Sequence, residues 1–308
     1  MILNKSYKRF IIWMLLPALA IVFLVIVFPI CMAFYLSFTE STVTGTGIKG
    51  DFIGLKNYIE LLKDDLFWES LRITLYFTVV SLLVEMVIGT LMALVLNKQF
   101  WGVKMLRSLV LLPWAVPTVV NARMWQWIFI GSDYGAFNKL FVKMGLIQNP
   151  IVWLSDKVPF EGIPIIGSFF EWIGATRALN MIILGDTWKT VPLVTLLLLA
   201  GLQTVPDSYY EAAAIDGAGK WKSFWSITVP MLKPVIVVVL VLRTMELFRV
   251  FDIIYIIMGY KINVLSILTF QEGLVYTHLG KGSALSFMIG LIILLISMFY
   301  INALKEKT

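Results

Sequence analysis

Long apolar runs separated by short polar segments dominate the hydropathy pattern of this chain. Six of these runs are long enough to cross a bilayer, which takes about 20 residues as a helix. They lie at 10–38, 71–96, 108–130, 179–203, 234–259 and 283–303. Backbone in lipid must satisfy its own hydrogen bonds, and none of the runs alternates as the strands of a membrane barrel do. The pattern therefore predicts a single domain of the all-α integral membrane class, with six transmembrane helices.

The composition agrees with this class and narrows the chemistry. Apolar residues make up 59 % and charged residues 14 % of the 308 positions, whereas a soluble domain has roughly 25 % charged residues. The net charge of +6 is spread between the runs, so we expect lipid and not nucleic acid as the partner surface. A single cysteine and a single histidine argue against a metal site.

The first run leaves two interpretations open. It follows three basic residues and contains Ala18-Leu19-Ala20, which resembles a signal-peptidase site. We favour an uncleaved anchor over a cleaved signal peptide because the apolar residues continue through Val27.

Basic residues set the expected orientation, since Lys and Arg favour the cytoplasmic side of a membrane. They are more than twice as dense in segments 1–9, 97–107, 204–233 and 304–308 as in segments 39–70, 131–178 and 260–282. We therefore expect both termini in the cytoplasm and 131–178 as the longest external loop. That loop has room for short helices but not for a separate domain.

The segment 206–234, between the fourth and fifth runs, predicts two helices joined by a break. Glu211 places negative charge near a helix N-terminus, and Ala212-Ala213-Ala214 favours helix. Gly217 allows the left-handed conformation that ends many helices. A second amphipathic stretch follows. We expect Pro230 and Pro234 to turn the chain back into the membrane.

Composition alone fits this segment to an ordinary helix at the lipid surface as well. A second reading fails: Gly217-Ala218-Gly219-Lys220 resembles part of a phosphate loop, but Ala214 stands where that loop needs glycine. Trp221 also stands where the loop needs Ser or Thr. We therefore reject nucleotide binding by this chain.

The residue types and spacings of the segment match a known family. Glu211-Ala212-Ala213 and Asp216-Gly217-Ala218, followed by Pro230 and Pro234, resemble the EAA motif of ABC importer permeases. The branch it resembles is the maltose, trehalose and glycerol-phosphate type, which imports sugars with a separate binding protein. The resemblance covers most of the chain from about residue 70 onward, but segment 157–177 is longer than in the family.

This resemblance implies the type I ABC importer permease fold in a bacterial or archaeal plasma (inner) membrane. In that family the EAA loop is a cytoplasmic coupling helix that docks on an ATPase subunit. The corresponding residues here are Glu211, Ala212, Ala213, Asp216, Gly217 and Ala218. ATP and Mg²⁺ would bind the ATPase subunits, so we expect no cofactor and no catalytic residue in this chain.

The resemblance also implies a set of partners. They are a second homologous permease, two ATPase subunits, an extracytoplasmic binding protein and a sugar substrate. We expect a heterodimeric pore, while a homodimer stays open. The solute stays open between a disaccharide, an oligosaccharide and a glycerol-phosphate-like molecule.

Charges inside the fifth run are the second clue to function. Arg243, Glu246, Arg249 and Asp252 alternate in sign at steps of three. An isolated charge in mid-membrane costs about 2.5–3.5 kcal/mol, and residues three apart on a helix can pair. The four charges therefore form either a self-neutralising ladder that holds the bundle together or part of a sugar path.

The resemblance to the maltose-type permease favours particular contacts in that path. Substrate contacts there correspond to Leu242, Met245, Glu246, Arg249, Lys189, Thr190 and Leu193. Asp252 and Asp186 are further candidates, either for the path or for neutralising a nearby base. Glu85 in the second run is expected to pair with another residue and is given no other role.

Two other classes of protein compete with a permease. A secondary transporter would use the membrane charges to couple ions, but it would not need an EAA loop. A membrane-embedded enzyme would need a catalytic set at one interface, and His278 has no acid–base partners at a recognisable spacing.

Overall fold

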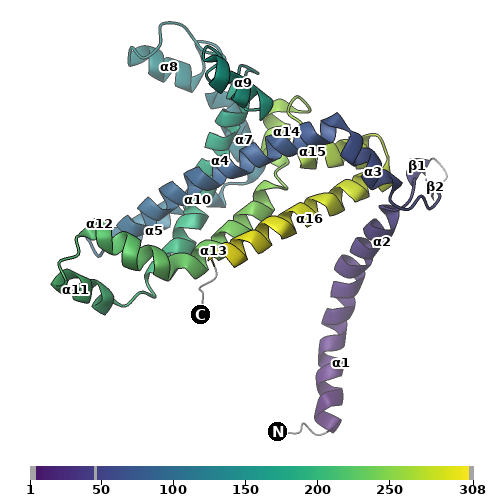
Figure 1. Cartoon of the computed structure of the whole chain (residues 1–308), viewed down its shortest axis with the longest axis horizontal. Coiled ribbons are helices and arrows are strands. Elements are labelled where there is room, and N and C mark those ends of the chain that lie inside the picture. Colours follow the sequence, from purple (N-terminus) through teal and green to yellow (C-terminus); the bar gives the residue numbers. More distant parts are fainter. Residues whose placement is uncertain (1–4, 45–46, 305–308) are drawn as a thin grey trace. The chain divides into compact units, whose positions relative to one another are not determined.

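The computed structural model describes residues 5–44 and 47–304, and helices dominate them (Figure 1). The chain divides into two compact units. The first comprises Met1–Asp65 and Leu268–Gly290, and the second comprises Leu66–Ile267 and Leu291–Thr308. The candidate site lies entirely in the second unit.

The first unit begins with a helical stretch formed by α1 (Lys5–Val22), η1 (Phe23–Val27) and α2 (Phe28–Leu36). Within the described stretch 10–36 no residue is buried, although almost every side chain there is apolar. Exposing an apolar surface of this length to water is unfavourable, so this stretch is suited to contact with lipid or with a partner subunit.

Polar contacts close the other end of the first unit. A short antiparallel pair, β1 (Thr42–Thr44) and β2 (Gly47–Lys49), precedes α3 (Lys56–Lys63). Asn57 is buried and donates to the carbonyls of Ser37 at 3.0 Å and Thr39 at 2.9 Å. These two bonds fix the start of α3 against the end of α2.

The second unit contains the remaining helices and part of the last one. They are α4 (Asp65–Leu96), α5 (Val103–Val110), α6 (Leu112–Ala115), α7 (Thr118–Ile128), α8 (Ala136–Lys143), α9 (Pro164–Trp172), α10 (Arg177–Leu202), α11 (Asp207–Ile215), α12 (Lys220–Ser223), η2 (Phe224–Thr228), α13 (Val229–Leu247), α14 (Asp252–Met258) and α15 (Leu265–Phe270). Helix α15 is divided, because Leu268–Phe270 belong to the first unit together with η3 (Gln271–Val275), and α16 (Leu279–Leu304) is divided after Gly290.

Helices α4, α10 and α13 form the centre of the second unit (Figure 1). Their apolar side chains, including Val194, Leu198 and Leu232, share one buried cluster. The close approach of these helices requires small residues at their contacts. A Cβ added to Gly89 would lie 2.7 Å from the Val194 side chain, and one added to Gly201 would lie 2.8 Å from Val235. Small residues at helix contacts are typical of membrane bundles.

Five described helices are long and apolar enough to span a membrane, and a bent pair makes a sixth candidate. This confirms the predicted all-α membrane class. The bent pair replaces the single span predicted at 108–130: Val103–Ala115 and Thr118–Ile128 meet at 89°. The chain is extended at Val116, just before Pro117, because proline disfavours helix in the residue that precedes it.

The fifth predicted span differs in two ways. Pro230 and Pro234 do not turn the chain, because α12, η2 and α13 form one helical stretch from Lys220 to Leu247. The π-turn in η2, where the Val229 N–H donates to the Phe224 carbonyl, precedes Pro230 and makes room for its ring. The predicted helix 234–259 is then interrupted at 248–251, before α14 begins.

The loop 131–178 contains the short helices α8 and α9, as its length suggested. Buried Asn138 organises it. The side-chain amide donates to the carbonyls of Ile130, Ser132 and Ile151 at 3.1–3.2 Å, and its oxygen accepts from Trp153 Nε1 at 2.8 Å. The long segment 157–177 contacts α4, where Arg72 lies 5.5 Å from the centre of the Trp172 ring.

Candidate functional site

A buried cluster of charges lies where α4, α10 and α13 meet. Arg243 on α13 uses two nitrogens on the Glu85 carboxylate of α4: Nε lies 2.8 Å from Oε2, and Nη2 lies 2.7 Å from Oε1. The Glu85 side chain is 0 % exposed and that of Arg243 is 3 % exposed. The contact is a desolvated, two-point pair, the strongest arrangement for arginine and a carboxylate.

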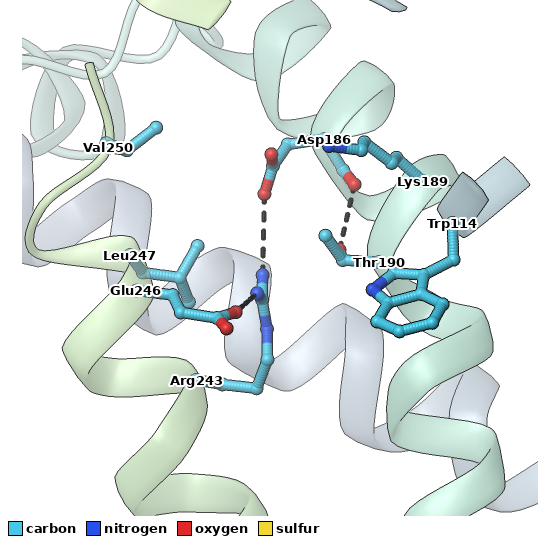
Figure 2. Close-up of a pocket in the computed structure, with 8 residues that line it drawn as sticks. All are labelled: Trp114, Asp186, Lys189, Thr190, Arg243, Glu246, Leu247 and Val250. Atoms are coloured by element: carbon cyan, nitrogen blue, oxygen red, sulfur yellow. Dashed lines mark hydrogen bonds and ion pairs between the residues drawn. The ribbon is translucent and has the colours of Figure 1, made fainter. Parts of the chain in front are cut away.

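Two more carboxylates share the same guanidinium. Asp186 Oδ2 on α10 lies 3.5 Å from Arg243 Nη2, and Glu246 Oε2 contacts Nη1 from one turn along α13. Figure 2 shows the guanidinium between these two carboxylates. Three acidic side chains therefore share one guanidinium.

Two threonine hydroxyls make further polar contacts with side chains of α10 and its neighbours. Thr190 Oγ1 lies 2.8 Å from Glu85 Oε1 and 2.8 Å from the Asp186 carbonyl, so its single proton is shared between two acceptors. Lys189 Nζ donates to Thr118 Oγ1 at 2.6 Å, at the start of α7. The cluster therefore ties four helices together through polar contacts in an apolar bundle.

The cluster forms one wall of a cavity of about 230 Å³. The residues that line it are Trp114, Asp186, Lys189, Thr190, Arg243, Glu246, Leu247 and Val250 (Figure 2). Carboxylates accept, an ammonium donates, and the indole ring offers a flat apolar face. The volume is below the roughly 300–1,000 Å³ of typical ligand pockets.

The structure brings three of the predicted path residues, Lys189, Thr190 and Glu246, together at this cavity with the further candidate Asp186. Leu242, Met245, Arg249 and Asp252 are exposed, Leu193 is half-buried, and none of these five lines it. Of the predicted ladder, Arg243 and Glu246 pair. Among described residues Arg249 and Asp252 form no ion pair, because the helix ends at Leu247 and places them beyond it.

Glu85 was expected only to pair with another residue, and its pair with Arg243 confirms this. Trp114 lines the cavity but was not among the predicted path residues. A charge inside an apolar run must find a partner in the membrane, so Glu85 was a visible signal. Its partner was not, because Arg243 lies 158 positions away.

The segment predicted to couple transport forms α11, a break, and the stretch α12–η2. Gly217 adopts φ +74°, and the Ala218 N–H donates to the Ala213 carbonyl at 2.8 Å. This hydrogen bond is typical of a helix that ends at a glycine in the left-handed conformation. Tyr210 Oη lies 3.0 Å from Thr228 Oγ1 and connects α11 to η2. The segment is a pair of helical pieces held in a fixed relation.

The six predicted coupling residues all lie on α11 or in the break that follows it. Glu211, Ala212, Asp216 and Gly217 are exposed, and Ala213 and Ala218 are half-buried. A surface with two carboxylates, Glu211 and Asp216, among alanines and a glycine permits close contact with another protein.

Comparison with known proteins gives the family. Residues 85–305 match the family described as the binding-protein-dependent transport system inner membrane component. The chain is 40 % identical to the trehalose/maltose transport system permease protein MalF of Thermococcus litoralis, with 94 % of this chain and 91 % of that protein covered. It is 32 % identical to the sulfoquinovosyl glycerol transport system permease protein SmoG of Agrobacterium fabrum, with 99 % and 93 % covered.

Solved structures agree on the fold. The chain resembles a chain of a bacterial ABC transporter involved in the import of the acidic polysaccharide alginate, with a TM-score of 0.73, 22 % identity, and 99 % and 98 % of the two chains covered. The resemblance predicted from the EAA-like segment is thereby confirmed. The chain belongs to the family of binding-protein-dependent transport system inner membrane components, and it is a multi-pass permease subunit of an ABC importer, not itself an enzyme.

Proposed function

We propose that this chain lines half of the translocation path for a sugar of di- or oligosaccharide size, delivered by an extracytoplasmic binding protein. The observation that carries the proposal is the polar cavity between α10 and α13, in a chain 40 % identical to a trehalose/maltose permease. The alginate transporter of similar fold has also been solved with an alginate pentasaccharide-bound periplasmic protein, which supports the same class of solute.

The cavity offers the chemistry that sugar hydroxyls need. Hydroxyls donate to carboxylates and accept from ammonium groups, so Glu246 and Lys189 can bind one ring from two sides. Trp114 can cover the apolar face of the ring. We assign Thr190 to the buried cluster rather than to the sugar, because Glu85 and the Asp186 carbonyl already share its hydroxyl.

Transport needs an energy source, and α11 is the proposed contact. Exposed Glu211, Ala212 and Gly217 would dock on one of two cytoplasmic ATPase subunits, which bind ATP and Mg²⁺. A second homologous permease would present its own coupling segment to the other ATPase. Because α11 is tied to η2, and η2 continues directly into α13, a movement of the docked helix would reach Arg243 and Glu246 along one helical stretch.

The test is reconstitution of the whole importer in proteoliposomes. The chain would be co-expressed with the permease, ATPase and binding-protein genes beside it, and uptake of labelled trehalose, maltose and glycerol 3-phosphate would be compared. We expect uptake of a sugar that requires ATP inside, the binding protein outside and both permeases. Uptake without ATP that stops on addition of an uncoupler would instead identify a secondary transporter.

A further inference from the structure

A second, larger cavity lies between the end of α4, the end of α10 and the segment α11–α13. Its volume is about 1060 Å³. Most of its wall is apolar, with side chains such as Met86, Leu91, Leu94, Leu198, Leu232 and Ile236. We call this cavity the loop groove.

Polar residues gather at one end of the loop groove. Asn97 and Lys98 follow the last turn of α4, and Lys220 and Ser223 line the groove from α12. Among the described residues that line the groove there is no Asp or Glu, although α11 carries Glu211 on its exposed face. The polar end therefore has two positive charges with no acidic side chain among its lining residues.

The length of the groove fits one leaflet of a bilayer. From Met86 to Leu96, where α4 ends, the helix advances about 15 Å. Half of the hydrocarbon core is about 15 Å thick. An apolar wall of this length that ends at two lysines matches an acyl chain that ends at a headgroup.

Aromatic residues place the polar end at the membrane boundary. Trp221 is 75 % exposed and Trp225 is 54 % exposed, and both line the groove beside Lys220. Trp is enriched where hydrocarbon meets headgroups, because its ring is apolar and its N–H is polar. Arg107 lies at the same end of α4, where its guanidinium donates to the Leu96 carbonyl at 2.7 Å.

We propose that the loop groove binds an anionic phospholipid, with its acyl chains along the α4–α10–α13 wall and its phosphate between Lys98 and Lys220. Basic pockets between membrane helices are known to recognise anionic headgroups. Only the choice of leaflet, the cytoplasmic one, rests on the proposed function. The bound lipid would link α4 to α12, directly after the break at Gly217, and so would hold the coupling segment against the bundle.

The experiment measures lipid that stays bound to the purified complete importer, with matched lysine variants. The complex would be reconstituted in nanodiscs of phosphatidylcholine and phosphatidylglycerol, extracted, and examined by native mass spectrometry. In the test variant Lys98→Gln and Lys220→Gln are combined, and in the control Lys104→Gln and Lys222→Gln are combined, because these neighbours do not line the groove. We expect at least a tenfold loss of retained phosphatidylglycerol in the test variant and no loss in the control.

A groove-filling variant, Thr90→Trp, should reduce retention as well, while leaving both lysines in place. Equal loss in both lysine pairs would show general surface charge and overturn the site. Equal retention of phosphatidylcholine, or a helix of the second permease in the groove in an electron-microscopy map of the complex, would also overturn it. None of these outcomes depends on which solute is imported, so the sugar proposal and the lipid proposal fail separately.

Discussion

Arg243 and Glu85 form a two-point pair in the centre of the bundle, although 158 positions separate them in the chain. The pair fixes the height of α13 against α4, and Thr190 adds α10 to the same carboxylate. A buried pair gains little over an apolar contact of the same shape, since both ions lose their water. Its main effect is to penalise any arrangement that separates the two groups.

We therefore expect Glu85→Ala to destabilise the complex strongly. The change removes the buried two-point partner of the Arg243 guanidinium, and removing one partner of a buried pair costs about 3–5 kcal/mol in comparable proteins. Asp186 and Glu246 still contact the guanidinium, so we expect a loss at the lower end of this range. The measurement is thermal unfolding of the purified complex in detergent.

The double variant Glu85→Leu with Arg243→Met provides the control for this prediction. It removes both charges, so we expect it to be more stable than the sum of the two single changes by about 0.5–3 kcal/mol. Additive effects of the two single changes would show that the pair is not coupled.

The pair also shows what could be read from the sequence. The helices α4, α10 and α16 follow from apolar runs, because lipid demands a long apolar helix and each run contains its own signal. Glu85 showed only that a charge inside an apolar run needs a partner. The identity of the partner depends on how the helices pack, and no local pattern contains that.

The two helix breaks differ in the same way, because one has its cause in the nearby sequence and the other in a tertiary contact. The break at Val116, where the two helices meet at 89°, has a local cause in Pro117, which is visible in the sequence. The break at 248–251 has neither glycine nor proline. There Ser266 Oγ, next to the start of α15, donates to the Val250 carbonyl that the helix has released, and this tertiary contact was invisible in the sequence.

Glu246 is predicted to affect transport more than stability. Its side chain lines the cavity and is 56 % exposed, so Glu246→Gln keeps the shape and removes one charged acceptor. A hydrogen bond to a charged group contributes about 1.5–3 kcal/mol, which corresponds to at least a tenfold rise in the KM for sugar uptake. Asp252→Asn makes the same chemical change outside the cavity and should leave the KM within about twofold. Equal effects of the two variants would refute the assignment of the cavity.

Glu211 is predicted to act in coupling rather than in folding. It is exposed on α11, so Glu211→Lys should leave the amount of protein in the membrane unchanged and abolish ATP-driven uptake. The reversed charge would oppose the docking of α11 on the ATPase subunit. Uptake and ATPase activity stimulated by the binding protein, measured on the same vesicles, check this, and normal uptake in the variant would remove Glu211 from the coupling surface.

Asn138 is predicted to hold the external loop in shape. Its amide donates to three carbonyls, and its oxygen accepts from the Ile151 N–H at 3.1 Å as well as from Trp153. Asn138→Asp keeps the size but removes both N–H donors and puts a carboxylate beside carbonyl oxygens, which costs about 1–3 kcal/mol for each buried group left without a partner. Hydrogen exchange of residues 131–153 in the complete importer should rise at least tenfold. Exposed Asn149→Asp, in the same loop, should leave the exchange unchanged, and similar exchange in the two variants would show that Asn138 does not organise the loop.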